Sequence, residues 1–283
     1  MSVNFNVNFS NNLVYAGGCA LNSLANGKIL ESKKFDNFFI PYAPGDAGGA
    51  IGASFCAFKS KFKKKPLTNI KSPFIGPKYS ADYIEKVISE NKTESFTYEK
   101  FDNNKELYII TSNLLAEKKI IGWFQDRMEF GARALGNRSI LADPREPEMK
   151  DILNEKIKKR ESFRPFAPVI LDYEKKNWFK LENNNPYMSF VETIIPEKRV
   201  KIAAVSHIDG TGRVQTVSKD TNLNLFLLLE SFFAKTGVPI LINTSFNENE
   251  PIVCKPSEAI DCFKRTKMDI LVIGSYFCAK EDS

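Results

Sequence analysis

The residues of this sequence whose types and spacing could do chemistry are its arginines. The chain has 40 basic residues, of which only nine are Arg, and none of these lies in the first 126 residues. Six then follow within residues 127–164: Arg127, Arg133, Arg138, Arg145, Arg160 and Arg164. A guanidinium presents a planar pair of donors that fits phosphate or carboxylate, whereas Lys is a compact, strongly hydrated charge. The stretch therefore indicates an anion site, and the alternative is an Arg-rich surface with distant ion pairs.

Polar side chains at the end of an apolar run strengthen the first interpretation. The stretch "RMEFGARALGNRSI" contains one acid, Glu129, and two glycines that let the backbone approach a ligand closely. Further along, the apolar run "VPILI" is followed directly by "NTSFN", which places amide and hydroxyl groups at a strand end. We expect the binding site there.

Length and composition exclude several classes of protein. The 283 residues are 43% hydrophobic, enough for one large or two smaller domains. No apolar run approaches the roughly 18 residues of a membrane span, and the first residues lack signal-peptide features, so we expect a cytoplasmic protein. One histidine and scattered cysteines argue against a metal cluster built by this chain alone. A net charge of +6 permits a phosphate-bearing ligand without requiring nucleic acid.

The positioning elements divide into three parts. In residues 1–58 we predict two strand-to-helix units, with a Gly-Gly turn after the first strand and a tightly packed helix after Asp46. Two such units do not make a complete domain. Residues 59–78, rich in Lys and Pro, predict a linker, with a nucleic-acid patch as the alternative.

Residues 79–283 predict a mixed α and β domain. Helical spacing appears in three stretches and begins with Ser80 as an N-cap in the first: residues 80–91, 107–119 and 146–159. A buried helix is expected to end at Gly237. Strand-like runs lie at 120–124, 139–143, 164–171, 213–217, 238–245 and 268–275.

Four blocks of this sequence resemble a known family. "GWFQDRMEFGARALGNRSILADPR", "FRPFAPVI", "HIDGTGRVQTV" and "LINTSFNENEPIVCKPSEAI" are similar to the C-terminal half of the O-carbamoyltransferases, which include nodulation and antibiotic-tailoring enzymes. The resemblance implies a YrdC-like domain with a twisted mixed sheet that makes carbamoyl-adenylate from carbamoyl phosphate, ATP and Mg²⁺. It also implies a preceding actin-like ATPase (ASKHA) domain, which holds iron through histidines and an aspartate and passes the carbamoyl group to an acceptor hydroxyl.

The same resemblance assigns roles to individual residues. The catalytic set around the phosphates and the carbamoyl group would be Arg133, Lys158, Arg164 and Arg213. Substrate and nucleotide contacts would come from Arg127, Arg138, Ser139, Met188, His207, Asn243, Ser245, Asn247, Gly17, Gly18 and Asn22, and a metal contact from Asp46. A structural role for His207 and a core role for Met188 remain open. Asp126 and Ala132 stand where the family usually has Gly and Pro.

The overall expectation is an α/β (α+β) chain in which a YrdC-like domain follows the remnant of an actin-like domain. We expect the adenylate-forming part of an O-carbamoyltransferase, with transfer dependent on a missing N-terminal half. That half would come from a separate polypeptide or a homo-oligomer, and iron would bind only if the partner supplied histidines. Two other hypotheses stay open, an RNA-binding module and an inactive fragment or regulatory subunit; membrane association is not expected.

Overall fold

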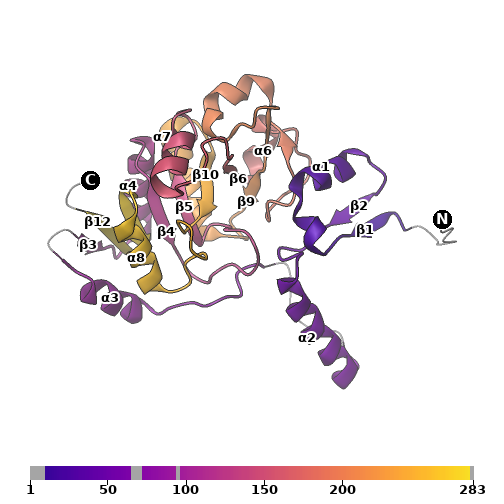
Figure 1. The fold of residues 1–283 in the computed structure, drawn as a ribbon, viewed down its shortest axis with the longest axis horizontal. Coiled ribbons are helices and arrows are strands. Elements are labelled where there is room, and N and C mark those ends of the chain that lie inside the picture. Colours follow the sequence, from indigo (N-terminus) through magenta and orange to yellow (C-terminus); the bar gives the residue numbers. More distant parts are fainter. Residues whose placement is uncertain (1–9, 65–71, 94–95, 281–283) are drawn as a thin grey trace.

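A mixed eight-stranded sheet forms the centre of the computed structural model, which describes residues 10–64, 72–93 and 96–280 (Figure 1). The strand order is β3-β12-β11-β4-β5-β10-β6-β9. The bounds are β3 Phe96–Lys100, β4 Ile121–Phe124, β5 Arg138–Ala142, β6 Ala167–Leu171, β9 Gln215–Val217, β10 Ile240–Ser245, β11 Ile270–Ile273 and β12 Tyr276–Lys280. β4 pairs with β11 and β6 with β9 in parallel, and the other neighbours are antiparallel. The expected mixed α/β class is confirmed.

The central strands form because they are apolar on both sides. All residues of β4, β5, β6 and β11 are buried, and apart from Arg138 and Ser139 at the start of β5 these strands show continuous hydrophobic runs where a half-exposed strand would alternate. The main hydrophobic core runs through this sheet and the helices packed on it. The polar ends of the strands are therefore the positions free to carry chemistry.

The helices confirm several sequence predictions. They are α3 Ala81–Glu90, α4 Asn104–Ala116, α5 Met149–Ile152, α6 Lys175–Trp178, α7 Leu223–Thr236 and α8 Pro256–Arg265. The Ser80 hydroxyl accepts the N–H of Tyr83 at 3.3 Å and caps α3. Gly237 ends α7 in the left-handed region, at φ 70°. α4 and α7 pack against each other.

The helix predicted over residues 146–159 has a different form. α5 is a single short α-helical segment and continues as a π-helix, η2 Leu153–Ile157. Met149, Leu153 and Ile157 are all buried, as their spacing predicts. π-helical turns are rare and often lie at functional sites, and this one ends at Lys158. Shorter elements complete the domain: η3 Asp172–Glu174, β7 Glu192–Thr193, η4 Pro196–Val205 and β8 Thr211–Gly212.

The two N-terminal strand-to-helix units lie beside the large sheet (Figure 1). β1 Asn12–Val14 and β2 Asn37–Phe39 pair in parallel, and η1 Gly18–Leu21 and α1 Ser23–Glu31 connect them. The Asn26 amide donates to the carbonyl of Ser189 at 2.9 Å, and the N–H of Val191 donates to the carbonyl of Ser23 at 3.2 Å. The units are thus bonded to the segment 187–191 of the larger domain.

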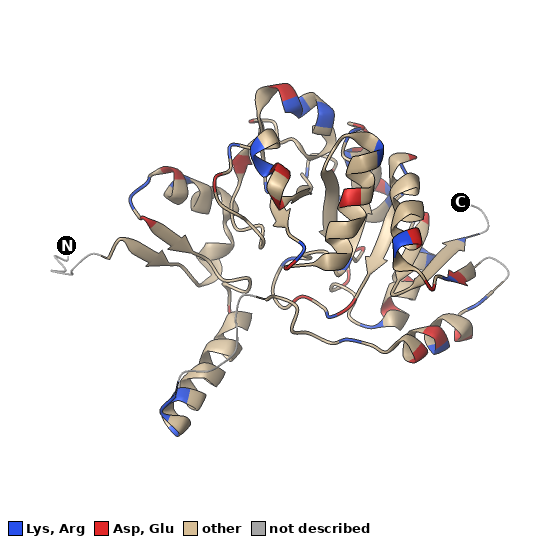
Figure 2. Ribbon diagram, turned by 180° about the vertical axis from the view of Figure 1, so that it is seen from behind, with Lys and Arg blue, Asp and Glu red and all other residues tan. Residues whose placement is uncertain are grey.

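α2 Ala47–Phe62 departs from the prediction. It begins directly after Asp46 as expected, but none of its residues is buried, and it projects from the rest of the chain (Figure 1). Its small residues thus lie at the surface, and the prediction of a tightly packed helix is wrong. The helix also runs past residue 58 into the expected linker. Its charge gathers at its last turn, in Lys59 and Lys61 (Figure 2), and linker residues 65–71 lie outside the described residues.

Candidate anion site

The loop between β4 and β5 is folded around a buried carboxylate. Glu129 is 6% exposed, and its Oε1 accepts the N–H groups of Leu135, Asn137 and Arg138 at 2.6, 3.0 and 3.3 Å. Gly131 and Gly136 take φ values of +128° and +107°, which other residues adopt only with strain. The loop bends near both glycines, and Arg133 lies between them in the sequence.

Two side chains from the sheet hold the same loop through its carbonyl groups. Asn243 of β10 is 2% exposed and donates to the carbonyl of Ala134 at 3.2 Å and to Gln215 Oε1 at 2.7 Å. Gln215 of β9 donates in turn to the carbonyl of Leu135 at 2.9 Å. The polar end of β10 thus fixes the loop that carries Arg133.

Three guanidinium groups lie near one another beside this loop and form a cation cluster, which has no acidic partner among the described residues. Arg133, Arg160 and Arg213 are partly buried. Burial, followed by the charges of Arg133 and Arg160, lowers the pKa of Arg213 to about 10. In residues 10–64, 72–93 and 96–280, none of the three forms an ion pair. Because partly desolvated cations need a counter-charge, this arrangement favours a bound anion.

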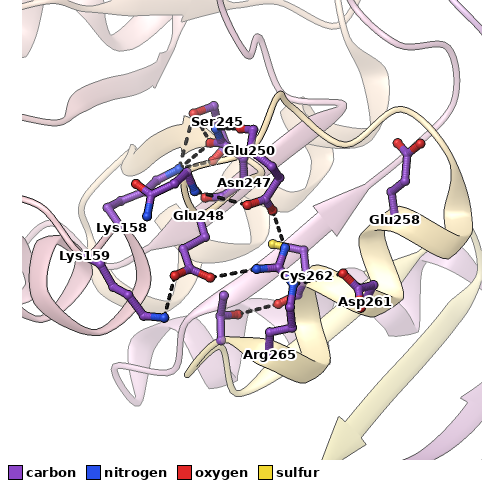
Figure 3. A network of polar contacts seen from close by, with 12 residues as sticks. Lys158, Lys159, Ser245, Asn247, Glu248, Glu250, Glu258, Asp261, Cys262 and Arg265 are labelled. Atoms are coloured by element: carbon purple, nitrogen blue, oxygen red, sulfur yellow. Dashed lines mark hydrogen bonds and ion pairs between the residues drawn. The ribbon is translucent and has the colours of Figure 1, made fainter.

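Lys158 adds a fourth cation at the end of β10 (Figure 3). It is 3% exposed, and its Nζ lies 2.6 Å from the carbonyl of Ser245 and 2.7 Å from both the carbonyl and Oδ1 of Asn247. Burial, followed by the charge of Arg160, lowers the pKa of Lys158 to about 7. Three short contacts suit the three donors of an ammonium while burial opposes its charge, so Lys158 changes protonation near neutral pH.

An outer ion-pair network holds the turn that binds Lys158 (Figure 3). The Asn247 amide donates to the carbonyl of Glu250 at 2.6 Å. Arg265 of α8 pairs with Glu248 at 2.8 Å, with Glu250 at 2.6 Å and with Asp261 at 2.9 Å. The charge of Arg265 is therefore neutralised by three carboxylates, whereas the arginines of the cation cluster form no ion pair with a described residue.

Comparison with known proteins places these residues within one family. The family model described as "Carbamoyltransferase C-terminus" matches residues 112–280, and the one described as "Carbamoyltransferase N-terminus" matches residues 2–55. The chain belongs to the carbamoyltransferase family. The expected family is thereby confirmed. The C-terminal match includes the loop around Glu129, the cation cluster and the end of β10.

The chain spans only 40 to 49% of the length of the relatives compared below. Nodulation protein NolO of Bradyrhizobium diazoefficiens is 39% identical, over 95% of this chain and 49% of its own length. Nodulation protein NolNO of Sinorhizobium fredii is also 39% identical, over 95% and 40%. The uncharacterized protein sll1178 of Synechocystis is 38% identical, over 95% and 48%. Full-length HypF in a phosphate- and nucleotide-bound form matches in structure with a TM-score of 0.42 and 17% identity, over 66% of this chain and 22% of that chain. A score that low supports no conclusion.

Two of the predicted arginines are not brought into the cluster. Arg138 is 0% exposed; it donates to the carbonyls of Gln125 and Asn137 at 2.6 and 2.8 Å, and its guanidinium carbon lies 3.6 Å from the ring centre of Phe124. Arg127 is exposed and donates to the carbonyl of Gly76 at 3.2 Å. Both side chains donate to backbone carbonyls and help to hold the loop. These two residues, which were predicted to contact the ligand, therefore have structural contacts here.

The remaining polar predictions also have defined places. The Ser139 hydroxyl accepts a hydrogen bond from the N–H of Gly136 at 3.1 Å and supports the bend of the loop at this glycine. Arg164 is exposed and pairs with Glu161 at 2.9 Å. The pKa of Arg160 is lowered first by burial and then by the charge of Arg164, so the two guanidiniums lie close to each other. Arg164 is thus at the rim of the cluster.

Met188 and His207 have places that fit the structural alternatives. Met188 is 4% exposed at φ 55° and packs on Leu135 and Ala167. The ring nitrogen Nδ1 of His207 lies 3.0 Å from the Thr211 hydroxyl, and the backbone N–H of His207 donates to the carbonyl of Thr211 at 2.8 Å. Burial lowers the pKa of His207, with a further effect from Arg213, so its ring is close to the cluster while closing the turn that precedes Arg213.

The N-terminal predictions separate into turn formers and a single acid. Gly17, at φ 100°, donates to the carbonyl of Pro44 at 2.6 Å, and Gly18 is exposed. Asn22 Oδ1 accepts the N–H of Ala25 at 3.1 Å and caps α1. Gly17 and Asp46 line one hollow of about 340 Å³. Asp46 is exposed, and one carboxylate is too small a donor set for iron.

Sequence reasoning missed three residues of this site as functional candidates. Arg160 was one of the six arginines that indicated an anion site but was given no role of its own, yet its charge lowers the pKa of both Lys158 and Arg213, after burial. Glu129 was noted only as an isolated acid, and Gln215 lay in a run predicted as an ordinary strand. Both act through contacts with the loop, which the sequence alone does not reveal.

Proposed function

We propose that this chain forms carbamoyl-adenylate from carbamoyl phosphate and ATP. The observation that supports it is the group of three partly buried guanidiniums with no acidic partner among the described residues, beside the buried Lys158. Carbamate and ATP are both anions, so their approach needs convergent cations that water does not screen. Membership of the carbamoyltransferase family supports the carbamoyl group as the one transferred.

The proposed reaction balances in two steps. Water cleaves carbamoyl phosphate to carbamate and phosphate. A carbamate oxygen then attacks the α-phosphorus of ATP, the new O–P bond forms, and the bond to the bridging oxygen breaks and releases pyrophosphate. Arg133, Arg160 and Arg213 would hold the anions together, and Lys158, in its protonated form, would place positive charge near the leaving group.

Mg²⁺ is proposed only as a companion of the nucleotide. No carboxylate of the described segments pairs with the three guanidiniums, and the oxygens nearest Lys158 are carbonyl, amide and hydroxyl groups already bonded to its Nζ. Such a set does not fit a protein-held Mg²⁺, which prefers carboxylates and water. When bound to ATP, the ion would neutralise phosphate charge.

Transfer to an acceptor hydroxyl is proposed to need more than these residues. Apolar side chains of the N-terminal units are exposed: Val14 by 70%, Phe39 by 50%, Phe58 by 38% and Phe62 by 51%. The chain spans about half the length of its relatives, so we propose that the rest of a carbamoyltransferase N-terminal domain covers this surface, from a separate polypeptide or within an oligomer. Iron would bind only where that part supplies histidines. A cytoplasmic location stays a proposal; none of the helices in the described parts of the chain is long and apolar enough to cross a bilayer.

The test is pyrophosphate release by the folded chain. Wild type should release pyrophosphate only when ATP, Mg²⁺ and carbamoyl phosphate are all present. Arg133→Lys should lose nearly as much activity as Arg133→Ala, because a guanidinium binds in a bidentate way. Replacing Lys63 and Lys64 together, outside the cluster, is the matched control. A folded chain that neither binds ATP nor releases pyrophosphate refutes the proposal, and salt-dependent RNA retention without ATP chemistry would favour the RNA-binding hypothesis.

A further inference from the structure

We infer that Glu129 is a positioning residue, whose buried carboxylate sets the geometry of Arg133 in the anion site; this rests on the proposed function. No sequence pattern assigns Glu129 a contact with ligand. Its role would act through the loop alone.

The contacts of Glu129 converge on one oxygen. Oε1 accepts three backbone N–H groups from residues that follow Arg133 in the loop, those of Leu135, Asn137 and Arg138. Oε2 is buried and has no hydrogen-bond partner in the part of the chain that the structure describes. A single acceptor shared by three donors brings those N–H groups close together, and hydrogen bonds to a charged acceptor are about twice as strong as neutral ones. The carboxylate therefore fixes the curvature of the loop.

The loop is held from two directions, so its remaining freedom is small. Glu129 accepts hydrogen bonds from the loop N–H groups, while Asn243 and Gln215 donate to the carbonyls of Ala134 and Leu135. The residue that these bonds leave to face the cluster is Arg133, whose guanidinium donates to the carbonyl of Leu21 at 3.2 Å. Removing the hydrogen bonds from the loop N–H groups to Glu129 should let Arg133 move away from Arg213.

Gly131 and Gly136 show how closely the loop is confined by its neighbours. A Cβ on Gly131 would lie 2.7 Å from the carbonyl oxygen of Tyr42, and one on Gly136 would lie 2.3 Å from Leu225. The backbone thus passes closely between neighbours in a conformation that few residues adopt without strain. Glutamine in place of Glu129 keeps the side-chain size but substitutes a neutral oxygen, and its NH₂ group accepts nothing.

The experiment is a double-mutant cycle on pyrophosphate binding, measured by calorimetry on the full chain. Glu129→Gln and Arg133→Ala should each weaken affinity about tenfold or more. If Glu129 acts through Arg133, the double variant should bind no more weakly than Arg133→Ala alone. A general structural role would instead multiply the two losses, and that result overturns the inference.

A matched control separates stability from positioning. Glu258 also accepts backbone N–H groups, those of Cys254 at 2.7 Å and Lys255 at 3.0 Å, but it caps α8 away from the cluster. Glu258→Gln should lower the midpoint of thermal unfolding and leave affinity unchanged. An equal loss of affinity in Glu258→Gln and Glu129→Gln also overturns the inference.

Two further outcomes keep the test decisive. If Glu129→Gln does not fold, Glu129→Asp replaces it in the cycle, because aspartate keeps the charge on a shorter side chain. The double variant is again expected to bind pyrophosphate no more weakly than Arg133→Ala alone. If Arg133→Ala binds pyrophosphate as tightly as wild type, the anion site itself is wrong. That failure is distinguishable, because the inference alone fails only when Arg133→Ala weakens binding and the effects multiply.

Discussion

Raising the pH from 7.5 to 9.5 should stabilise the folded chain through Lys158. Burial and the charge of Arg160 lower the pKa of this residue to about 7, against an ordinary value of 10.5. Between these two values the unfolded chain binds a proton that the folded chain does not. The free energy of unfolding therefore rises with pH across this window, and below pH 7 the folded state carries the full cost of the buried charge.

The size of the effect follows from the two pKa values. One proton of difference changes the free energy of unfolding by about 1.36 kcal/mol per pH unit. Integrated from pH 7.5 to 9.5, with the folded pKa near 7 and the unfolded one near 10.5, the contribution of Lys158 is about 2.5 kcal/mol.

The assay is chemical denaturation of wild type and Lys158→Met at the two pH values. Other groups titrate as well, but they cancel when the pH dependence of the variant is subtracted from that of wild type. Lys118, 58% exposed and paired with Glu146, provides the control, because Lys118→Met should keep the wild-type pH dependence. If Lys158→Met and wild type gained the same stability between the two pH values, the reasoning about burial of this amine would be refuted.

Three other predictions concern the cation cluster, the loop and the N-terminal surface. Arg213→Met should raise the melting temperature by scanning calorimetry while weakening pyrophosphate binding, because it removes a partly buried cation that has no acidic partner among the described residues; a lower melting temperature would contradict this. Gly136→Ala should cost more than about 1 kcal/mol in denaturation, because the glycine has φ +107° and its Cβ would lie 2.3 Å from Leu225; a neutral effect would show that the loop adapts. Replacing Phe58 and Phe62 of α2 with Ser should lower self-association in light scattering, since both are exposed, and unchanged association would exclude this helix from the contact.

Much of the secondary structure could be predicted because its signals are local. Ser80 caps α3 and Gly237 ends α7, as their side-chain chemistry and backbone freedom predict. The apolar runs became strands because both of their sides are buried. α2 was mistaken for a packed helix because small residues permit close packing without specifying a partner for it.

Local spacing was a weaker guide to which arginines meet. Arg138 and Arg160 are equally visible in the sequence, yet Arg138 is enclosed by loop carbonyls while Arg160 lies beside Arg213. That division depends on the path of the loop, which is held by Asn243, more than 100 residues away in sequence. Hydrogen bonds of such separation leave no periodic signal.

The sequence by itself determined the family and the mixed α/β class, and it predicted an anion site, because motif order, hydrophobic runs and an unbalanced set of arginines are properties of the chain. Tertiary structure alone decided which cations converge, how far burial lowers the pKa of Lys158, and that Glu129 holds the loop of Arg133. These depend on desolvation and on contacts between distant segments, which exist only once the sheet brings β5, β9 and β10 together.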